Sequence, residues 1–252
     1  MEWHFLLPAI KSIKLLDQKI VGCTKCPRLV QWREEVAVVK RKAYENEKYW
    51  GKPVPGFGPD KARIVIVGLA PGAHGANRTG RIFTGDSSGD WLYGSLHRIG
   101  IAKIPTSKSR DDGQELRDTR ISMAVRCAPP ENKPTTQERD TCAPFFVNEL
   151  QLIAPTVRSF VALGSFGWQV LIKALKDQGH KVPAGKFGHG AALKYSHDGV
   201  NYLILGSYHP SQQNTFTGKL TKPMLDAVLK KGAKFAGIKF YLDGDNFVEV
   251  KI

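Results

Sequence analysis

The fold is decided by the stretch ARIVIVGLAPGAHG, residues 62–75, in which a short run of β-branched residues opens into a glycine-rich loop. An apolar run of this kind is typical of a parallel strand buried on both faces. Three further strands are predicted at 119–125, 157–163 and 200–205. Helical patterns lie between and after the strands, at 88–99, 136–153, 165–176 and 221–234. This alternation predicts an α/β sandwich around a mostly parallel sheet of about four strands.

The rest of the chain adds flanking elements to this sandwich, and we expect one domain over residues 1–252. A helix is predicted over residues 2–20, followed by a charged helix over 27–47. The Pro/Gly-rich stretch 50–59 excludes regular structure there. Residues 103–118 are interpreted as a polar surface insertion. The tail, residues 238–252, has partly alternating apolar residues and no function that the sequence indicates.

Composition narrows the class of protein. Among 252 residues, 37 Lys and Arg against 23 Asp and Glu give a net charge of +14, which favours a polyanion such as nucleic acid as partner. A hydrophobic content of 42% and a charged content of 24% exclude global disorder. No apolar run approaches the roughly 20 residues of a membrane span. The first eight residues lack the pattern of a signal peptide, so we expect a cytoplasmic protein with no membrane partner.

The four cysteines are interpreted either as a lone Cys-x-x-Cys plus two buried thiols or as one metal site. Cys23 and Cys26 form a Cys-x-x-Cys, and Cys127 and Cys142 follow much later. Structural disulfides are rare in the cytosol, and this Cys-x-x-Cys does not follow a strand as a redox pair would. Four thiolates suit zinc or an iron–sulfur cluster. The wide gap between the last two cysteines does not fit a compact zinc finger and favours the cluster.

Three of the predicted strands end in unusual loops, which should meet at one edge of the sheet because ligands of open parallel sheets lie beyond the carboxyl ends of the strands. The glycines of the first loop fit neither the dinucleotide fingerprint nor a Walker A motif, so no nucleotide cofactor is expected. Asp86, in that loop, is either a helix N-cap or a functional carboxylate. Phe83 is either a core aromatic or a platform on which a planar base stacks.

The other two loops each carry one candidate side chain. Asn132, in a loop with two prolines, either serves turn chemistry or presents its amide to the edge of a base. His209 follows a strand and is either structural or a hydrogen-bond donor to a developing anion. No Gly-x-Ser-x-Gly elbow and no zinc-deaminase signature is present, which disfavours a serine hydrolase and a base deaminase.

Several motifs together resemble a known family. They are the segment CTKCPRLV at 23–30, WREE at 32–35, PVPGFG at 53–58, and the three loops at 68–86, 124–135 and 207–221. In these segments, spread over most of residues 20–235, the sequence resembles the family 5 (type-b) uracil-DNA glycosylases. The resemblance implies a three-layer α/β/α sandwich and a 4Fe–4S cluster held by Cys23, Cys26, Cys127 and Cys142. It implies excision of uracil, and of hypoxanthine or other deaminated bases, from DNA.

The resemblance also implies roles for single residues. Asp86 corresponds to the active-site aspartate, Asn132 to a residue that contacts the base, and His209 to the group that stabilises the departing base anion. The residues expected to form the base-binding wall are Gly68, Ala70, Gly72, Ala73, Phe83 and Asn132. The family shares the lack of a carboxylate or amide near Gly72 and Ala73, so the group that positions water is left open.

Because of this resemblance, we expect the excess positive charge of the chain to serve DNA binding. The residues expected to contact DNA are Arg78, Arg81, Lys133, Gln212 and Lys219, although each cation is equally interpreted as a solvated surface charge. We expect a monomer that associates with the nucleoid. The alternative function is a non-catalytic nucleic-acid-binding protein with a structural zinc tetrathiolate, which needs the charge and the cysteines but not the three loop residues.

Overall fold

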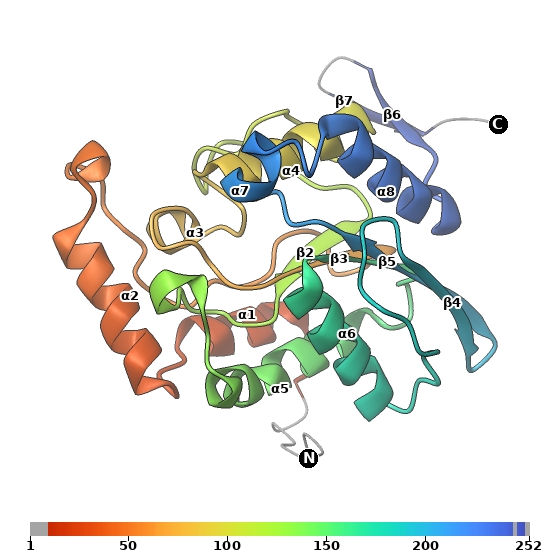
Figure 1. Cartoon of the computed structure of the whole chain (residues 1–252), viewed down its shortest axis with the longest axis horizontal. Coiled ribbons are helices and arrows are strands. Elements are labelled where there is room, and N and C mark those ends of the chain that lie inside the picture. Colours follow the sequence, from red (N-terminus) through yellow and green to blue (C-terminus); the bar gives the residue numbers. More distant parts are fainter. Residues whose placement is uncertain (1–9, 244–245, 250–252) are drawn as a thin grey trace.

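A computed structural model describes residues 10–243 and 246–249, which are arranged in three layers (Figure 1). The middle layer is a five-stranded sheet with the strand order β2-β1-β3-β5-β4. Four strands run parallel, and β4 pairs antiparallel with β5 at one edge. The strands are β1 (Ile64–Gly68), β2 (Thr119–Met123), β3 (Ser159–Leu163), β4 (Ala192–His197) and β5 (Val200–Ser207).

Helices cover both faces of the sheet (Figure 1). One face carries α4 (Ser87–Arg98), α7 (Gln212–Phe216) and α8 (Lys222–Phe235), and the other carries α1 (Ile13–Val21), α5 (Thr136–Ile153) and α6 (Ser165–Asp177). Beside one end of the sheet lie α2 (Pro27–Val39), the 3-10 turn η1 (Lys42–Tyr44) and the short α3 (Ala76–Thr79). The remaining elements are the 3-10 turn η2 (Pro130–Asn132) and a hairpin of β6 (Phe240–Asp243) and β7 (Asn246–Glu249).

The apolar run of β1 is buried on both faces because successive side chains point to opposite sides of a strand. Val65 and Val67 belong to the core under α1, α5 and α6, whereas Ile64 and Ile66 belong to the core under α4 and α8. Every residue of β1, β2 and β3 is buried. The interpretation of the first apolar run as a strand buried on both faces is therefore confirmed.

The predicted α/β sandwich is confirmed, and its four predicted strands and the four helices between and after them all exist. The expected strand count was low, because the edge strand β4 was not predicted. The charged helix predicted over 27–47 was too long: α2 ends at Val39, and Lys40 follows with a φ of 55°, which breaks the helix. Helix α1 begins at Ile13, and residues 1–9 of the predicted first helix lie outside the described residues.

The interpretation of residues 103–118 as a surface insertion is only partly right. Ser107 and Gln114 are buried within it, and Ala102 forms a β-bridge with Leu116 that closes its ends. The Gln114 amide donates to the carbonyls of Ile104 (2.7 Å) and Thr106 (2.9 Å), which holds the segment folded back on itself. Within the described residues, no helix is long and apolar enough to cross a membrane.

Candidate active site

The loops that follow β1, β2 and β5 surround one cavity of about 630 Å³ at the carboxyl ends of these strands. Asp86, Asn132 and His209, one from each loop, all line it. The predicted meeting of the three loops at one edge of the sheet is thus confirmed. Other predicted residues in the cavity wall are Ala70, Gly72, Ala73, Phe83 and Gln212.

The structure makes the two interpretations of Asp86, as an N-cap and as a functional carboxylate, compatible with each other. Asp86 is the N-cap of α4, and its Oδ1 accepts a hydrogen bond of 2.9 Å from the Gly89 N–H. The same side chain also lines the cavity. A Cβ at Gly75 would lie 2.0 Å from the Asp86 Oδ2, so glycine is needed there to leave room for the carboxylate. Burial raises the pKa of Asp86 above its usual value.

His209 and Phe83 lie against each other in the cavity wall. Their ring centroids are 5.7 Å apart, with 32° between the ring planes. Burial lowers the pKa of His209 to about 4, so its imidazole is neutral at pH 7. Phe83 has a φ of 50°, a region that bulky residues rarely adopt. Such backbone strain gathers at functional sites, and here it fixes an aromatic face beside the imidazole.

Asn132 lies in a strained turn at the end of η2. Glu131 and Asn132 both have positive φ values, 52° and 56°, and the Asn132 N–H donates to the Pro129 carbonyl at 3.2 Å. Asparagine tolerates this conformation better than most residues, which supports the turn interpretation. Because its exposed side chain also borders the cavity, the turn interpretation and base contact do not exclude each other.

The four cysteines border a second, small space of their own, between the N-terminal end of α2, the loop after β2 and α5. The Cys127 Sγ accepts a hydrogen bond of 3.0 Å from the Arg33 Nη1, and the Cys142 Sγ accepts one of 3.3 Å from the Arg126 N–H. Burial raises the pKa of the Cys127 thiol to about 11 and that of Cys142 to about 12.

This donor set fits a cofactor held by four thiolates. All four side chains border the same enclosed space, although they come from segments far apart in the sequence. Within the described residues, no three His, Cys, Asp or Glu side chains are arranged as ligands of a single ion. N–H groups already directed at two of the sulfurs match the hydrogen bonds that cluster thiolates accept.

Comparison with known proteins identifies the family. The family model described as the uracil DNA glycosylase superfamily matches residues 55–231, which include all three cavity loops. The chain belongs to this superfamily. The type-5 uracil-DNA glycosylase of Mycobacterium tuberculosis is 51% identical over 228 residues, 90% of this chain and 83% of that protein. The type-5 enzyme of Thermus thermophilus is 48% identical over 221 residues, 88% of this chain and 97% of that protein.

More distant relatives carry the same kind of name. The type-4 uracil-DNA glycosylase of Pyrobaculum aerophilum is 27% identical over 221 residues, 87% of this chain and 90% of that protein. The type-5 protein of the same organism is 43% identical over 219 residues, 87% of this chain and 91% of that protein. This chain therefore groups with the type-5 glycosylases within the superfamily, as the resemblance implied.

Two of the predicted DNA contacts are not free surface cations in this superfamily member. Arg81 is 4% exposed and forms a two-pronged ion pair with Asp112, with distances of 2.7 and 2.6 Å. Arg78 is buried, pairs with Glu47, and donates to the Gly85 carbonyl at 2.8 Å. Both guanidinium groups tie the first cavity loop to neighbouring segments, so the prediction that they bind phosphate does not fit the structure.

We therefore expect Arg81→Ala to act on stability. Removing one partner of a buried ion pair leaves the other charge uncompensated and typically costs about 3–5 kcal/mol. Urea unfolding should show a loss near the lower end of that range, because Asp112 keeps some contact with water. The salt dependence of DNA binding should match that of the unchanged protein. Normal stability together with a smaller salt slope would instead restore the predicted phosphate contact.

Of the remaining predicted site residues, Gly68 lies behind the cavity wall, and Lys133 and Lys219 are exposed on the surface. Gly68 does not line the cavity; a Cβ there would lie 3.0 Å from the Phe83 ring, so Gly68 makes room for that ring from behind. Lys133 is exposed next to Asn132 and pairs with Glu131 at 3.1 Å. Lys219 is exposed, with its Nζ 4.9 Å from the centroid of the Tyr208 ring. These two lysines remain available to a polyanion.

Sequence reasoning missed several cavity residues. Arg41 and Tyr44, from the segment after α2, line the wall, and His74 lines it with its Nδ1 3.1 Å from the Tyr49 hydroxyl. The basic run Lys40-Arg41-Lys42 could have indicated a binding segment, but it was interpreted as part of the helix predicted over residues 27–47.

Phe216, at the end of α7, was also missed. Its side chain is 79% exposed, which is unusual for an aromatic residue.

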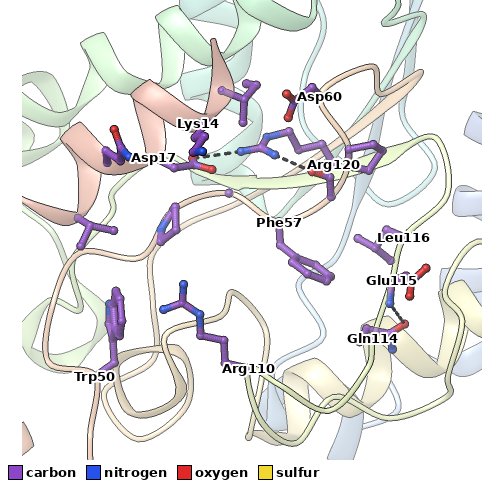
Figure 2. A pocket seen from close by; sticks show the side chains of 17 residues that line it. Lys14, Asp17, Trp50, Phe57, Asp60, Arg110, Gln114, Glu115, Leu116 and Arg120 are labelled. Atoms are coloured by element: carbon purple, nitrogen blue, oxygen red, sulfur yellow. Dashed lines mark hydrogen bonds and ion pairs between the residues drawn. The ribbon is translucent and has the colours of Figure 1, made fainter.

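A further cavity, of about 810 Å³, is larger than the cavity that Asp86, Asn132 and His209 line, and it shares no lining residue with that cavity. Figure 2 shows Trp50 and Arg110 on one side of it, and Asp17 with Arg120 on another. The Arg110 guanidinium stacks 4.5 Å from the Trp50 ring. Arg120 is fully engaged, with Asp17 at 3.3 Å, the Gly58 carbonyl at 2.7 Å and Glu149 at 2.5 Å.

Proposed function

We propose that this chain hydrolyses the N-glycosidic bond of uracil in DNA and releases the base, leaving an abasic site. One observation carries the proposal: a carboxylate, an amide and a neutral imidazole from three separate loops line one cavity beside an aromatic ring. The names of the relatives at 43–51% identity support the same reaction.

The substrate base must leave the duplex to reach this cavity. A base inside the stack is inaccessible, so glycosylases rotate the nucleotide outwards at a cost of a few kcal/mol. The exposed Phe216 stands on α7, whose first residues Gln212 and Gln213 line the cavity, and an apolar side chain in that position suits insertion into the gap. Exposed Arg41, Lys133 and Lys219 near the cavity supply cations for phosphate contacts.

Breaking the bond leaves positive charge on the sugar and negative charge on the base. The Asp86 carboxylate stabilises the sugar cation and helps orient water. Its position is fixed because Oδ1 is held by the first turn of α4, which leaves Oδ2 for this work. Catalysis then rests on positioning and electrostatics, with no covalent intermediate on the protein.

His209 and Asn132 act on the base. The neutral imidazole donates a hydrogen bond to the base oxygen as that oxygen becomes anionic. The Asn132 amide offers donors and an acceptor to the adjacent carbonyl and N–H of the base, and Phe83 stacks on its ring. Hypoxanthine presents the same carbonyl beside an N–H, and the small side chains of Ala70 and Ala73 leave room for a purine. We infer that hypoxanthine is a second substrate.

One assay tests this function. Purified protein is incubated with a duplex oligonucleotide that contains one uracil, then treated with alkali and run on a denaturing gel. We expect cleavage at the uracil position, and weaker cleavage at hypoxanthine. Absence of cleavage at uracil, combined with retained DNA binding, would leave the non-catalytic nucleic-acid-binding protein as the better description.

We also propose that Cys23, Cys26, Cys127 and Cys142 hold a 4Fe–4S cluster. Four cysteines that border one enclosed space suit a cluster, in which each thiolate binds its own iron, and the wide gap between Cys127 and Cys142 does not fit a compact zinc finger. When bound, the cluster supplies a rigid cross-link between the start of α2 and the loop that carries Asn132. Its function is structural, and every step above belongs to the side chains of the cavity.

Metal analysis checks the cluster directly. Protein purified without oxygen should be brown and should contain iron and acid-labile sulfide in equal amounts. Cys142→Ala should lose most of the iron, since it removes one of the four ligands, a buried side chain of α5. A colourless protein that contains zinc and no iron, after anaerobic purification, would contradict the proposal.

A further inference from the structure

Two arginines are buried around the four cysteines. Arg33, on α2, is 3% exposed, and Arg126, directly before Cys127, is 1% exposed. The Arg33 Nη1 donates to the Cys127 Sγ at 3.0 Å and to the Cys23 carbonyl at 3.2 Å. Arg126 borders the cysteine-lined space, and its main-chain N–H donates to the Cys142 Sγ at 3.3 Å. Long cationic side chains are rarely buried to this degree without an anionic partner.

The carboxylates nearby do not balance these charges. Arg126 shares the buried Glu149 with Arg120, whose second carboxylate partner is the partly exposed Asp17. The carboxylate that pairs with Arg33 is Glu34, at 3.5 Å, and its side chain is 59% exposed. Among the described residues, the Arg33 Nε and the Arg126 Nε and Nη1 are buried and find no hydrogen-bond partner. The region holds more positive charge and more N–H donors than its carboxylates satisfy.

Arg33 is also tied to the wall of the base cavity. Its main-chain carbonyl accepts a hydrogen bond of 3.1 Å from the Asn77 Nδ2. Asn77 is fully buried in α3, and its N–H donates to the Gly72 carbonyl at 3.0 Å. Since Gly72 lines the base cavity, a short chain of contacts joins Cys127 to that cavity through Arg33 and Asn77.

We propose that Arg33 and Arg126 are the counter-ions of an anionic four-thiolate metal centre, and that Arg33 is a positioning residue that joins this centre to the first cavity loop. Four thiolates around a 4Fe–4S core carry net negative charge, which compensates two buried cations. Protonated thiols carry none and would leave Arg33 paired with the exposed Glu34, and Arg126 dependent on the carboxylate that it shares with Arg120. The inference rests on the cluster proposed above and adds the residues that neutralise it.

Arg33→Gln tests this proposal because it removes the charge and keeps an amide donor. Iron should pass to a chelator about 10- to 100-fold faster, the range expected when an outer partner of a metal ligand is lost. The reduction potential of the cluster should move to more negative values, because a nearby cation favours the more negative, reduced form. Arg33→Lys keeps the charge and should fall between Arg33→Gln and the unchanged protein in both measurements.

Arg120→Gln is the matched control. Arg120 is equally buried and shares Glu149, but its partners are two carboxylates and the Gly58 carbonyl, as Figure 2 shows for Asp17. The Arg120→Gln substitution should destabilise the fold while leaving the reduction potential of the cluster nearly unchanged. If Arg33→Gln and Arg33→Lys both match the unchanged protein in potential and iron release, the proposal is wrong. If anaerobically purified protein holds no iron, the cluster itself is wrong, which is a separate outcome.

Discussion

Asp86→Asn is expected to excise uracil about 100- to 1000-fold more slowly than the unchanged protein in single-turnover experiments. Asparagine is as good an N-cap as aspartate, so the hydrogen bond from the Gly89 N–H and the start of α4 survive. The substitution therefore removes the negative charge and little else. The loss measures how much that charge stabilises the cationic sugar.

Two controls separate this effect from a folding defect. Asp90→Asn removes the neighbouring carboxylate, which is exposed in the first turn of α4 and does not line the cavity, and should retain full activity. Affinity for uracil-containing DNA should be nearly the same in all three proteins. An Asp86→Asn chain that turns over at the normal rate would remove Asp86 from the mechanism.

The rate should also depend on pH through Asp86. Burial raises the pKa of this carboxyl, and only the ionised form stabilises the cation. The rate should therefore fall as the pH drops through that raised pKa, at a higher pH than an exposed aspartate would give. His209 does not contribute between pH 5 and pH 8, since its pKa is about 4 and it stays neutral there.

His209→Ala is expected to lower the single-turnover rate by about 100- to 1000-fold, the usual loss when one donor to a developing anion is removed. His209→Gln keeps an N–H donor on a side chain of different shape, so it should recover part of the rate. The aromatic contact with Phe83 is lost in both variants, and comparing them therefore isolates the donor.

The matched control is His97→Ala, which removes a histidine of α4 that does not line the cavity. Thermal unfolding should show that every variant is folded at the assay temperature. If His209→Ala and His209→Gln lose the same amount of rate, a hydrogen bond from the imidazole is not what His209 contributes.

Much of the fold was predictable because the relevant signals are local. The apolar run of β1 predicted a strand buried on both faces, and the loops after β1, β2 and β5 were placed together by the geometry of parallel sheets. Strand β4 was not predicted, because it is an edge strand in which partly buried and exposed residues alternate, and its place depends on pairing with β5.

The residues that line the site could be predicted from the sequence, but the side chains that form ion pairs and hydrogen bonds with them could not. Arg78 and Arg81 look like surface cations in the sequence, and only the fold brings Glu47 and Asp112 to them. The same limit applies to Arg33, whose sulfur partner is far away in the sequence. In the glycine-rich first loop, Gly68 and Gly75 make room for the Phe83 ring and for the Asp86 carboxylate, which only the fold brings next to them.

The proposed excision of uracil is tested most directly by the quantity of free base that the protein releases from DNA. Duplex DNA carrying labelled uracil is mixed with excess protein, and free uracil and abasic sites are counted in the same sample. We predict equal amounts of both from the unchanged protein, and almost none from the Asp86→Asn/His209→Ala double variant at equal DNA binding. No free uracil from the unchanged protein, or undiminished release from the double variant, would contradict the proposed function.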